Sequence, residues 1–139
     1  MKKEVNFYQV DEGIIKALAP LLIKILEEKK KVLVFCRSEN LMKEIDNSLW
    51  SYGRNKFIPH VTISDREFEM KRQPILITNK EENTNHADYL VFLDEPDEAF
   101  ISKFSRVFYF YEPGKFAAKT EPTNSYKKVD GKWVKLNSK

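Results

Sequence analysis

The sequence has 139 residues, of which 42% are hydrophobic and 32% are charged, and its formal net charge is +3. This length and composition indicate one folded domain, which we expect to span residues 1–139, and they exclude a disordered or fibrous chain. No run approaches the roughly 20 apolar residues of a membrane span, and the start shows no signal peptide, so we expect a cytoplasmic protein. The single Cys36 excludes an internal disulfide, and with two histidines the sequence offers too few ligands for a structural metal.

The basic charge is concentrated near the end of the sequence. Residues 115–139 contain seven lysines against Glu121 and Asp130, an excess of five, whereas the first 114 residues hold 17 basic and 19 acidic side chains. This pattern favours an acidic partner, either a nucleic acid or an acidic peptide. A lysine-rich end can equally be a solvated surface with no partner, and charge alone does not separate these interpretations.

The first half of the chain alternates strand and helix patterns. Residues 5–10 are predicted to form a strand, and Asp11 offers an N-cap for a helix whose apolar positions over residues 14–26 recur every three and four residues. Pro20 must lie near the first turn of that helix or kink it. The continuous apolar run at 31–36 predicts a parallel strand that is buried on both faces.

A second helix should follow this strand, with Ser38 as its cap and Gly53 just beyond its end. Its buried stripe consists of four residues spaced by three or four positions: Met42, Ile45, Leu49 and Tyr52.

Three further apolar runs, rich in β-branched and aromatic residues, predict interior strands of the same sheet. They are residues 75–78, 89–93 and 107–111. Strands that alternate with helices imply right-handed crossovers, and therefore a mostly parallel, three-layer α/β sheet.

Shorter features connect and follow these strands. Residues 79–87 form a polar loop, and short helices are expected at 97–104 and 115–119. The pair Asp130-Gly131 predicts a hairpin between two terminal strands, although a single terminal strand is the alternative.

The motifs of nucleotide-dependent and hydrolytic enzymes are absent from the sequence. None of the four glycines belongs to a GxGxxG or GxxxxGK[ST] arrangement, so no glycine-rich turn can hold a phosphate. Cys36 ends a predicted buried strand and is interpreted as a core residue, while His60 and His86 have no suitably spaced nucleophile. The adjacent acidic pairs belong to solvated loops and helix ends. We therefore expect no catalytic residue, no cofactor and no metal.

Trp50 departs from the core pattern. It follows Leu49 by one residue, about 100 degrees around the helix, so we expect it at the edge of the core. Either the segment 57–60 folds back and covers it, or it forms a wall of a binding pocket. Tyr111 and Tyr126 admit the same two interpretations.

Six segments, spread over nearly the whole chain, carry a family resemblance: residues 5–10, 31–36, 45–50, 57–60, 75–78 and 125–129. In order and spacing they resemble the chi subunit of bacterial DNA polymerase III. The most specific part is Leu49-Trp50, separated by six residues from Phe57-Ile-Pro-His60. Chi proteins are similar to nucleotide-binding, Rossmann-like folds yet bind no nucleotide, which agrees with the absence of a phosphate loop.

The resemblance implies an adaptor that ties the clamp loader, through the psi subunit, to the acidic C-terminal tail of the single-stranded-DNA-binding protein. DNA would be reached only indirectly, and no membrane is involved. The terminal phenylalanine of the tail would enter an apolar pocket, and its carboxylate would meet a basic side chain. The resemblance assigns these residues to the site: Trp50, Phe57, Tyr111, Lys119 and Tyr126. Thr123, just after Pro122, stands where the family has a second cation, and Lys115, Lys127 or Lys128 could replace it.

Such a pocket requires the lysine-rich segment to pack beside the end of the second helix. The alternative hypothesis is direct binding of single-stranded nucleic acid by the basic, aromatic C-terminal region. That function needs several cations along a groove and affinity without a protein partner, whereas the adaptor needs one pocket. A nucleotide enzyme on the same fold is a third possibility, which the positions of the glycines disfavour.

Overall fold

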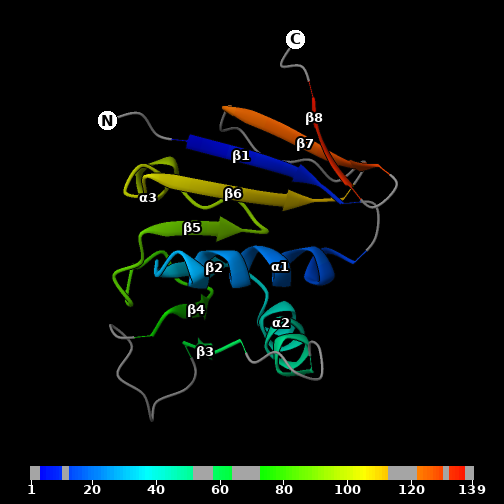
Figure 1. Ribbon diagram of the computed structural model, residues 1–139. Helices are drawn as coiled ribbons and strands as arrows, with labels where there is room; N and C mark the ends of the chain where they lie inside the picture. The colour runs from blue at the N-terminus through cyan, green and yellow to red at the C-terminus, as the bar shows by residue number, and fades with distance from the viewer. Residues whose placement is uncertain are drawn as a thin grey trace.

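The computed structural model describes residues 4–10, 13–51, 58–63, 73–112, 122–129 and 132–136. The elements, shown in Figure 1, are β1 (Glu4–Gln9), α1 (Ile14–Glu27), β2 (Val32–Phe35), α2 (Glu39–Ser51), β3 (Val61–Thr62), β4 (Ile75–Thr78), β5 (Tyr89–Phe92), α3 (Glu98–Ile101), β6 (Arg106–Tyr111), β7 (Asn124–Val129) and β8 (Lys132–Leu136). None of the described helices has the length and apolar character needed to cross a membrane.

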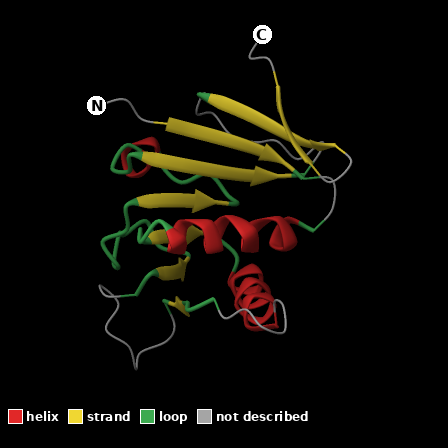
Figure 2. Ribbon diagram, in the orientation of Figure 1, coloured by secondary structure: helices red, strands yellow, loops and turns green. Residues whose placement is uncertain are grey.

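One eight-stranded sheet contains all of these strands, in the order β3-β4-β2-β5-β6-β1-β7-β8. Neighbouring strands are parallel except for β8, which runs antiparallel to β7. The sheet and its helices are coloured separately in Figure 2. The protein therefore has an α/β fold with a mostly parallel sheet, as the sequence predicts.

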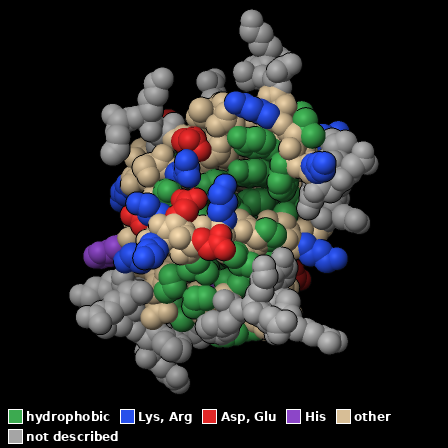
Figure 3. Space-filling model, in the orientation of Figure 1, with side chains coloured by type: hydrophobic (Ala, Val, Ile, Leu, Met, Phe, Trp, Pro, Cys, Tyr) green, Lys and Arg blue, Asp and Glu red, His purple; other side chains and the backbone are tan. Residues whose placement is uncertain are grey.

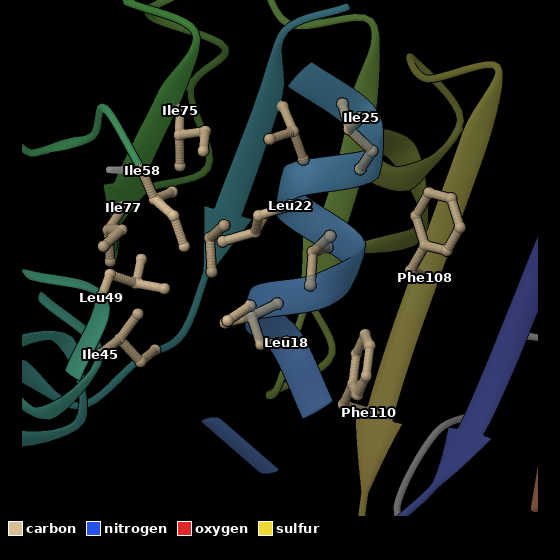
Figure 4. Packing of buried hydrophobic residues seen from close by; sticks show 14 of the residues in the cluster. Leu18, Leu22, Ile25, Ile45, Leu49, Ile58, Ile75, Ile77, Phe108 and Phe110 are labelled. Atoms are coloured by element: carbon tan, nitrogen blue, oxygen red, sulfur yellow. The ribbon is translucent and has the colours of Figure 1, made fainter. Parts of the chain in front are cut away.

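Different helices cover the two faces of the sheet. In β2, Val32 and Val34 pack with α1 and α2, whereas Leu33 and Phe35 pack with α3 on the other face. Figure 4 shows the first cluster, in which side chains of α1, α2, β4 and β6 meet. Because each central strand is buried on both sides, its sequence is a continuous apolar run.

The four apolar runs of the sequence are β2, β4, β5 and β6, and all four are interior strands, as predicted. Every residue of β2, β4 and β5 is buried. The run at residues 89–93 is thus a strand and not a turn of buried helix. The two-residue β3 is not predicted, because two residues are too few to show a periodic pattern.

The start of α1 differs from the prediction. Gly13, and not Asp11, is the N-cap, and its φ of 69° and ψ of 61° place it in the left-handed region that glycine adopts readily. Pro20 lies inside α1, so of the two predicted alternatives the position near the first turn is excluded, and a kink stays a prediction. The helix begins later than expected because the left-handed conformation of Gly13 interrupts the chain just before Ile14.

The start of α2 agrees with the prediction. The Oγ of Ser38 accepts a hydrogen bond from the backbone N–H of Leu41 at 3.2 Å, which is an N-cap contact. The stripe residues Met42, Ile45 and Leu49 are buried. Tyr52 and Gly53, with which the expected helix ends, lie outside the described residues.

Two predictions concern the second half of the chain. α3 is shorter than the expected helix at 97–104, because the chain turns after Ile101 and brings Phe104 into the core. The terminal hairpin is confirmed by the antiparallel pairing of β7 with β8. The helix expected at 115–119 lies outside the described residues.

Candidate functional site

The residues assigned to the peptide site occupy three places in the fold. Trp50 lies in the last turn of α2, Tyr111 ends β6, and Tyr126 lies in β7, where Lys127 and Lys128 follow it. Three assigned residues lie outside the described part of the chain: Phe57, Lys115 and Lys119.

Trp50 and Tyr126 are at opposite ends of the sheet. α2 contacts β3 and β4 near one edge, whereas β7 is next to the other edge. The strands β2, β5, β6 and β1 lie between them, and α1 covers the middle of the same face (Figure 1). Strands are about 4.8 Å apart, so five strand intervals from β4 to β7 span about 24 Å. The expected packing of the lysine-rich segment beside the end of α2 is therefore not found for residues 124–129 and 132–136.

Tyr111 and Tyr126 lie on opposite faces of the sheet. In the strand register, Tyr8 of β1 pairs with Tyr126, and the next residue, Gln9, pairs with both Tyr111 and Lys127. Successive residues of a strand point to opposite faces. Tyr126 is therefore on the α1 face with Tyr8, while Tyr111 and Lys127 are on the α3 face. The described residues do not bring Trp50, Tyr111 and Tyr126 together.

Tyr126 belongs to a group of rings that we call the aromatic face, formed by Tyr8, Tyr126 and Trp133. The ring of Tyr8 stacks on Tyr126 with centroids 5.0 Å apart and planes at 14°, and it meets Trp133 edge-on at 5.0 Å. Phe110 stacks on Tyr8 at 5.0 Å and links this group to the core. Burial raises the pKa of Tyr8 to about 12, and the neighbouring Tyr126 hydroxyl and Glu4 carboxylate add to the effect. Tyr8 is thus neutral at physiological pH.

The aromatic face is accessible to solvent and has a cation beside it. Trp133 is 38% exposed, and Tyr8 and Tyr126 are half-buried. Lys135 pairs directly with Tyr126 across the hairpin, so it is on the same face. Figure 3 shows hydrophobic side chains above α1, with Lys and Arg side chains around them. Such a surface can hold an aromatic group next to a carboxylate.

Trp50 has a different environment. It is 54% exposed, and its ring contacts the ring of His60 with centroids 4.5 Å apart. His60 is buried and fixed at both nitrogens, since Nδ1 is 2.6 Å from the backbone oxygen of Ile58 and Nε2 is 2.8 Å from Oδ1 of Asp46. Residues 58–60 therefore reach Trp50 through His60, yet more than half of the indole stays exposed. The interpretation that this segment covers Trp50 is thus confirmed in part, while a role of the indole as a wall of a binding pocket stays a prediction.

Tyr111 lies in a third environment, on the α3 face. It is half-buried and stacks on Tyr109 with centroids 5.2 Å apart. Burial raises the pKa of its hydroxyl above the ordinary value of 10.0. Gln9 separates Tyr111 from Lys127 in the same row of the sheet. The α3 face thus also carries an aromatic ring, that of Tyr111, and a cation, Lys127, on the two sides of Gln9.

The carboxyl ends of β2 and β5 form the switch point of the sheet, from which the chain continues in opposite directions. Doubly wound folds bind phosphates there, with backbone N–H groups at the start of a helix. Here the backbone N–H of Arg37 donates to Oδ2 of Asp94 at 2.9 Å. The Arg37 guanidinium donates to the backbone oxygen of Glu95 at 2.9 Å and lies 3.6 Å from the carboxylate of Glu81. The backbone N–H and the guanidinium of Arg37 are therefore both engaged by groups of the protein itself.

Asp94→Ala is expected to lower the free energy of unfolding by about 1 to 2 kcal/mol, because the Arg37 backbone N–H loses its acceptor at the start of α2. Asp94→Asn keeps an oxygen acceptor and should cost less. Urea denaturation of the parent and both variants measures the difference. Equal stability of Asp94→Ala and the parent would contradict the role given to this carboxylate.

Metal-binding and nucleophilic side chains are present among the described residues. No group of three or more His, Cys, Asp or Glu side chains there is arranged to hold a metal ion. Cys36 is fully buried, and burial raises the pKa of its thiol to about 12, with the nearby carboxylate of Asp94 adding to the effect. Cys36 is therefore a core residue, as the sequence predicts, and the raised pKa disfavours the thiolate form in which thiols react.

The fold and these surfaces define an α/β protein whose exposed aromatic groups are suited to contacts with other macromolecules. The family model described as DNA polymerase III chi subunit, HolC, matches residues 1–136. The chain therefore belongs to the DNA polymerase III chi subunit family, which by its name comprises accessory subunits of that polymerase.

Three relatives carry the same family name. The DNA polymerase III subunit chi of Haemophilus influenzae is 28% identical over 133 residues, covering 93% of this chain and 91% of the relative. That of Pseudomonas aeruginosa is 28% identical over 107 residues, covering 74% and 72%. A probable DNA polymerase III subunit chi of Rickettsia prowazekii is 30% identical over 95 residues, covering 68% of this chain but 56% of the relative. The last match thus spans little more than half of that relative's length.

Sequence reasoning did not identify several residues around the assigned ones. Trp133 and Lys135 can be found from the Asp130-Gly131 turn, because a two-residue hairpin loop fixes which residues of the two strands face each other. Tyr8 cannot be found in this way, since its contact with Tyr126 depends on the pairing of strands far apart in the sequence. The contact of Trp50 with His60 likewise has no local signal.

Proposed function

We propose that this chain is a non-catalytic adaptor of the polymerase III clamp-loader complex that binds the acidic C-terminal tail of the single-stranded-DNA-binding protein and links it to the complex through the psi subunit. Membership of the chi family supports the assignment to the polymerase. The proposal includes a three-layer, Rossmann-like scaffold that acts in the cytoplasm without a cofactor and reaches DNA indirectly. The hydrogen-bonded switch point is consistent with a scaffold that needs no nucleotide.

The observation that carries this proposal is the stacking of Tyr126 on Tyr8 with Lys135 opposite. A tail that ends in a phenylalanine needs an aromatic surface for its ring and a cation for its carboxylate, and both are present there. Trp50 contacts the ring of His60, and His60 in turn contacts the carboxylate of Asp46. A carboxylate this close to Trp50 makes its surroundings less suitable for an acidic tail. We therefore place the terminal residue of the tail at Tyr126.

The affinity can be estimated from these contacts. A buried phenyl ring contributes about 2 to 3 kcal/mol by area, and a charge-assisted contact adds about 1.5 to 3 kcal/mol. Ordering a flexible tail offsets part of this gain, and nearby lysines attract the acidic residues of the tail. The two contacts give about 3.5 to 6 kcal/mol before the ordering cost, so about micromolar affinity, on the order of 8 kcal/mol, requires these lysines to add roughly 2 kcal/mol or more. Lys119, which the family resemblance assigns to the tail, belongs to the same proposal, as does Lys115 as a replacement for the second cation.

Titration with the last ten or so residues of the tail should give saturable binding that is lost when the terminal phenylalanine is removed. Tyr126→Ala should weaken binding by about tenfold or more, because it removes the ring on which the phenylalanine packs. Trp50→Ala should bind the tail within about twofold of the parent, because it lies at the other end of the sheet. Calorimetry measures all three affinities.

Two outcomes of this titration would contradict the proposal in different ways. If the parent does not bind the tail, the proposed function is wrong. If Trp50→Ala loses the tail while Tyr126→Ala binds normally, the function stands but the tail binds beside α2. Circular dichroism of each variant checks that it is folded.

A second candidate function is direct binding of single-stranded nucleic acid. The aromatic face and Lys135 favour it, because bases stack on aromatic rings while lysines contact phosphates. Direct binding predicts affinity for a thymine oligonucleotide in the absence of any protein partner, falling steeply with added salt. Our proposal instead predicts that DNA is retained only when the tail-bearing protein is present.

A further inference from the structure

We infer that the β7–β8 hairpin is a separately docking unit of the fold, which detaches from β1 and returns while the other six strands of the sheet stay folded. The buried Asn6 and its partner Asn124 fix the register in which the hairpin returns. This behaviour belongs to the free protein and does not depend on the proposed function.

The described interior of the protein ends at β1. The two clusters of buried core residues extend as far as β1 and Val10, which follows it, and neither cluster includes a residue of β7 or β8. Residues 124–127 and 132–136 are half-buried or exposed. The two strands lie beyond β1 at one edge of the sheet, where β7 pairs with β1 and β8 pairs with β7 (Figure 1). Because burial of apolar surface supplies most of the stability of a fold, the interior can stay packed when the hairpin leaves.

The ring contacts of the hairpin can break without opening the core. Tyr126 and Trp133 each contact Tyr8, with ring centroids 5.0 Å apart in both pairs. Tyr8 also stacks on Phe110 at 5.0 Å and on Phe108 at 6.2 Å, and both of these rings belong to β6. Detachment of the hairpin therefore exposes one side of Tyr8 and leaves its contacts with the core in place.

Polar contacts join the hairpin to β1. Nδ2 of Asn124 donates to Oδ1 of Asn6 at 3.0 Å, and Nδ2 of Asn6 donates to Oε2 of Glu4 at 2.9 Å. The same carboxylate oxygen lies 3.2 Å from Nε of Arg106 in β6. Because each hydrogen bond within a protein replaces one to water, its net contribution is modest. These contacts therefore hold the hairpin in a defined place but less firmly than burial holds the central strands.

Asn6 fixes the register of β7. It is 2% exposed, so its Oδ1 needs a donor from the protein while the hairpin is docked. A shift by one residue would turn every side chain of β7 to the opposite face. A shift by two residues would place Pro122 or Tyr126 opposite Asn6. Neither can replace the amide of Asn124, because proline has no donor and the tyrosine hydroxyl lies at the far end of its ring.

Native-state hydrogen exchange of the full chain, followed by NMR at increasing but non-denaturing urea, tests whether the hairpin opens by itself. Protection of the hydrogen-bonded amides of β7 and β8 should be lower than that of β2 and β5 by about 100-fold or more. The hairpin amides should share one opening free energy with a weak urea dependence, because opening exposes little surface. The amides of β2 and β5 should exchange through global unfolding, with a strong urea dependence.

A substitution in the core separates the two kinds of opening. Ile77 is buried in β4, so Ile77→Val should speed exchange in β2 and β5 about fivefold and leave the hairpin amides within about twofold of the parent. The reason is that the contacts of Ile77 are lost in global unfolding but kept when the hairpin alone detaches.

A substitution in the hairpin should have a different pattern. Asn124→Ala removes a contact that only the docked state makes, so the hairpin amides and the central strands should both exchange about tenfold faster. A second set of amide signals for residues 125–127 should appear, from a shifted pairing with β1. Asn47→Ala, at an exposed position of α2, is the matched control and should change neither rates nor signals.

Three results would overturn the inference. The hairpin is not a separate unit if Ile77→Val speeds its exchange as much as that of β2 and β5, or if its urea dependence equals theirs. The role of Asn6 and Asn124 in the register is wrong if Asn124→Ala behaves like Asn47→Ala. Because none of these measurements uses the tail, a failure here is distinct from a failure of the proposed function.

Discussion

Asn85→Asp is expected to lower the free energy of unfolding by about 3 kcal/mol. The side chain of Asn85 is fully buried, and its Nδ2 donates to the backbone oxygens of Val32 at 3.2 Å and Gln73 at 3.0 Å. It thereby ties the loop between β4 and β5 to the chain at the starts of β2 and β4. An aspartate has the same shape but cannot donate these bonds, and its buried charge would face two carbonyl oxygens.

Urea denaturation at pH 7 measures the loss, with Glu82→Gln as the matched control. That substitution exchanges a carboxylate and an amide in the same loop at an exposed position, so it should change stability by less than about 0.5 kcal/mol. Asn85→Ala, which also removes both donors but buries no charge, should fall between the two. A stability of Asn85→Asp within 1 kcal/mol of the parent, about the scale of a single ordinary hydrogen bond, would show that the two bonds are dispensable.

The importance of Asn85 could not be predicted from the sequence. It lies in a polar run, KEENTNHAD, that correctly predicts a loop, and nothing in that run distinguishes a buried asparagine from an exposed one. Its two acceptors belong to residues 12 and 53 positions away in the chain. Local patterns therefore identified the loop but not its anchor.

The central strands could be predicted because their signal is local. A strand that is buried on both faces is expected to be apolar along its length. β2, β5 and β6 satisfy this condition over four or more residues, and β4 satisfies it over three, followed by the buried Thr78. The order of the strands has no such signal. It places β1 between β6 and β7, and it is this order that separates Tyr126 from the α2 end of the sheet.

In the candidate site, too, the local features could be predicted from the sequence and the long-range arrangement could not. The step of about 100 degrees from Leu49 places Trp50 at the margin of the core, and its indole is indeed more than half exposed. The resemblance assigned Trp50 and Tyr126 to one pocket, but a resemblance in sequence does not show how far apart two residues lie in the fold. Only the strand order and the alternation of faces show that these two residues, with Tyr111, occupy three surfaces.

Raising the pH from 9 to 12 is expected to cost the parent protein up to about 4 kcal/mol of stability through Cys36 alone. Its pKa is raised from 9.0 to about 12 in the folded protein, chiefly by burial. Below pH 9 the thiol is protonated in both the folded and unfolded states, so it makes no pH-dependent contribution. Between the two pKa values the unfolded chain releases the proton and the folded chain does not, which favours unfolding. Stability is therefore lost as pH rises through this window.

Cys36→Ala removes the titrating group and isolates its effect from other alkaline changes. Tyr8, whose pKa is also raised to about 12, is present in both proteins and cancels in the comparison. The difference in unfolding free energy between parent and variant, measured in urea at each pH, should be constant up to pH 9 and then move in favour of the variant. Parallel curves up to pH 12 would mean that the thiolate forms in the folded protein at its ordinary pKa. In that case Cys36 would be accessible enough to react, and its assignment as a core residue without chemistry would be wrong.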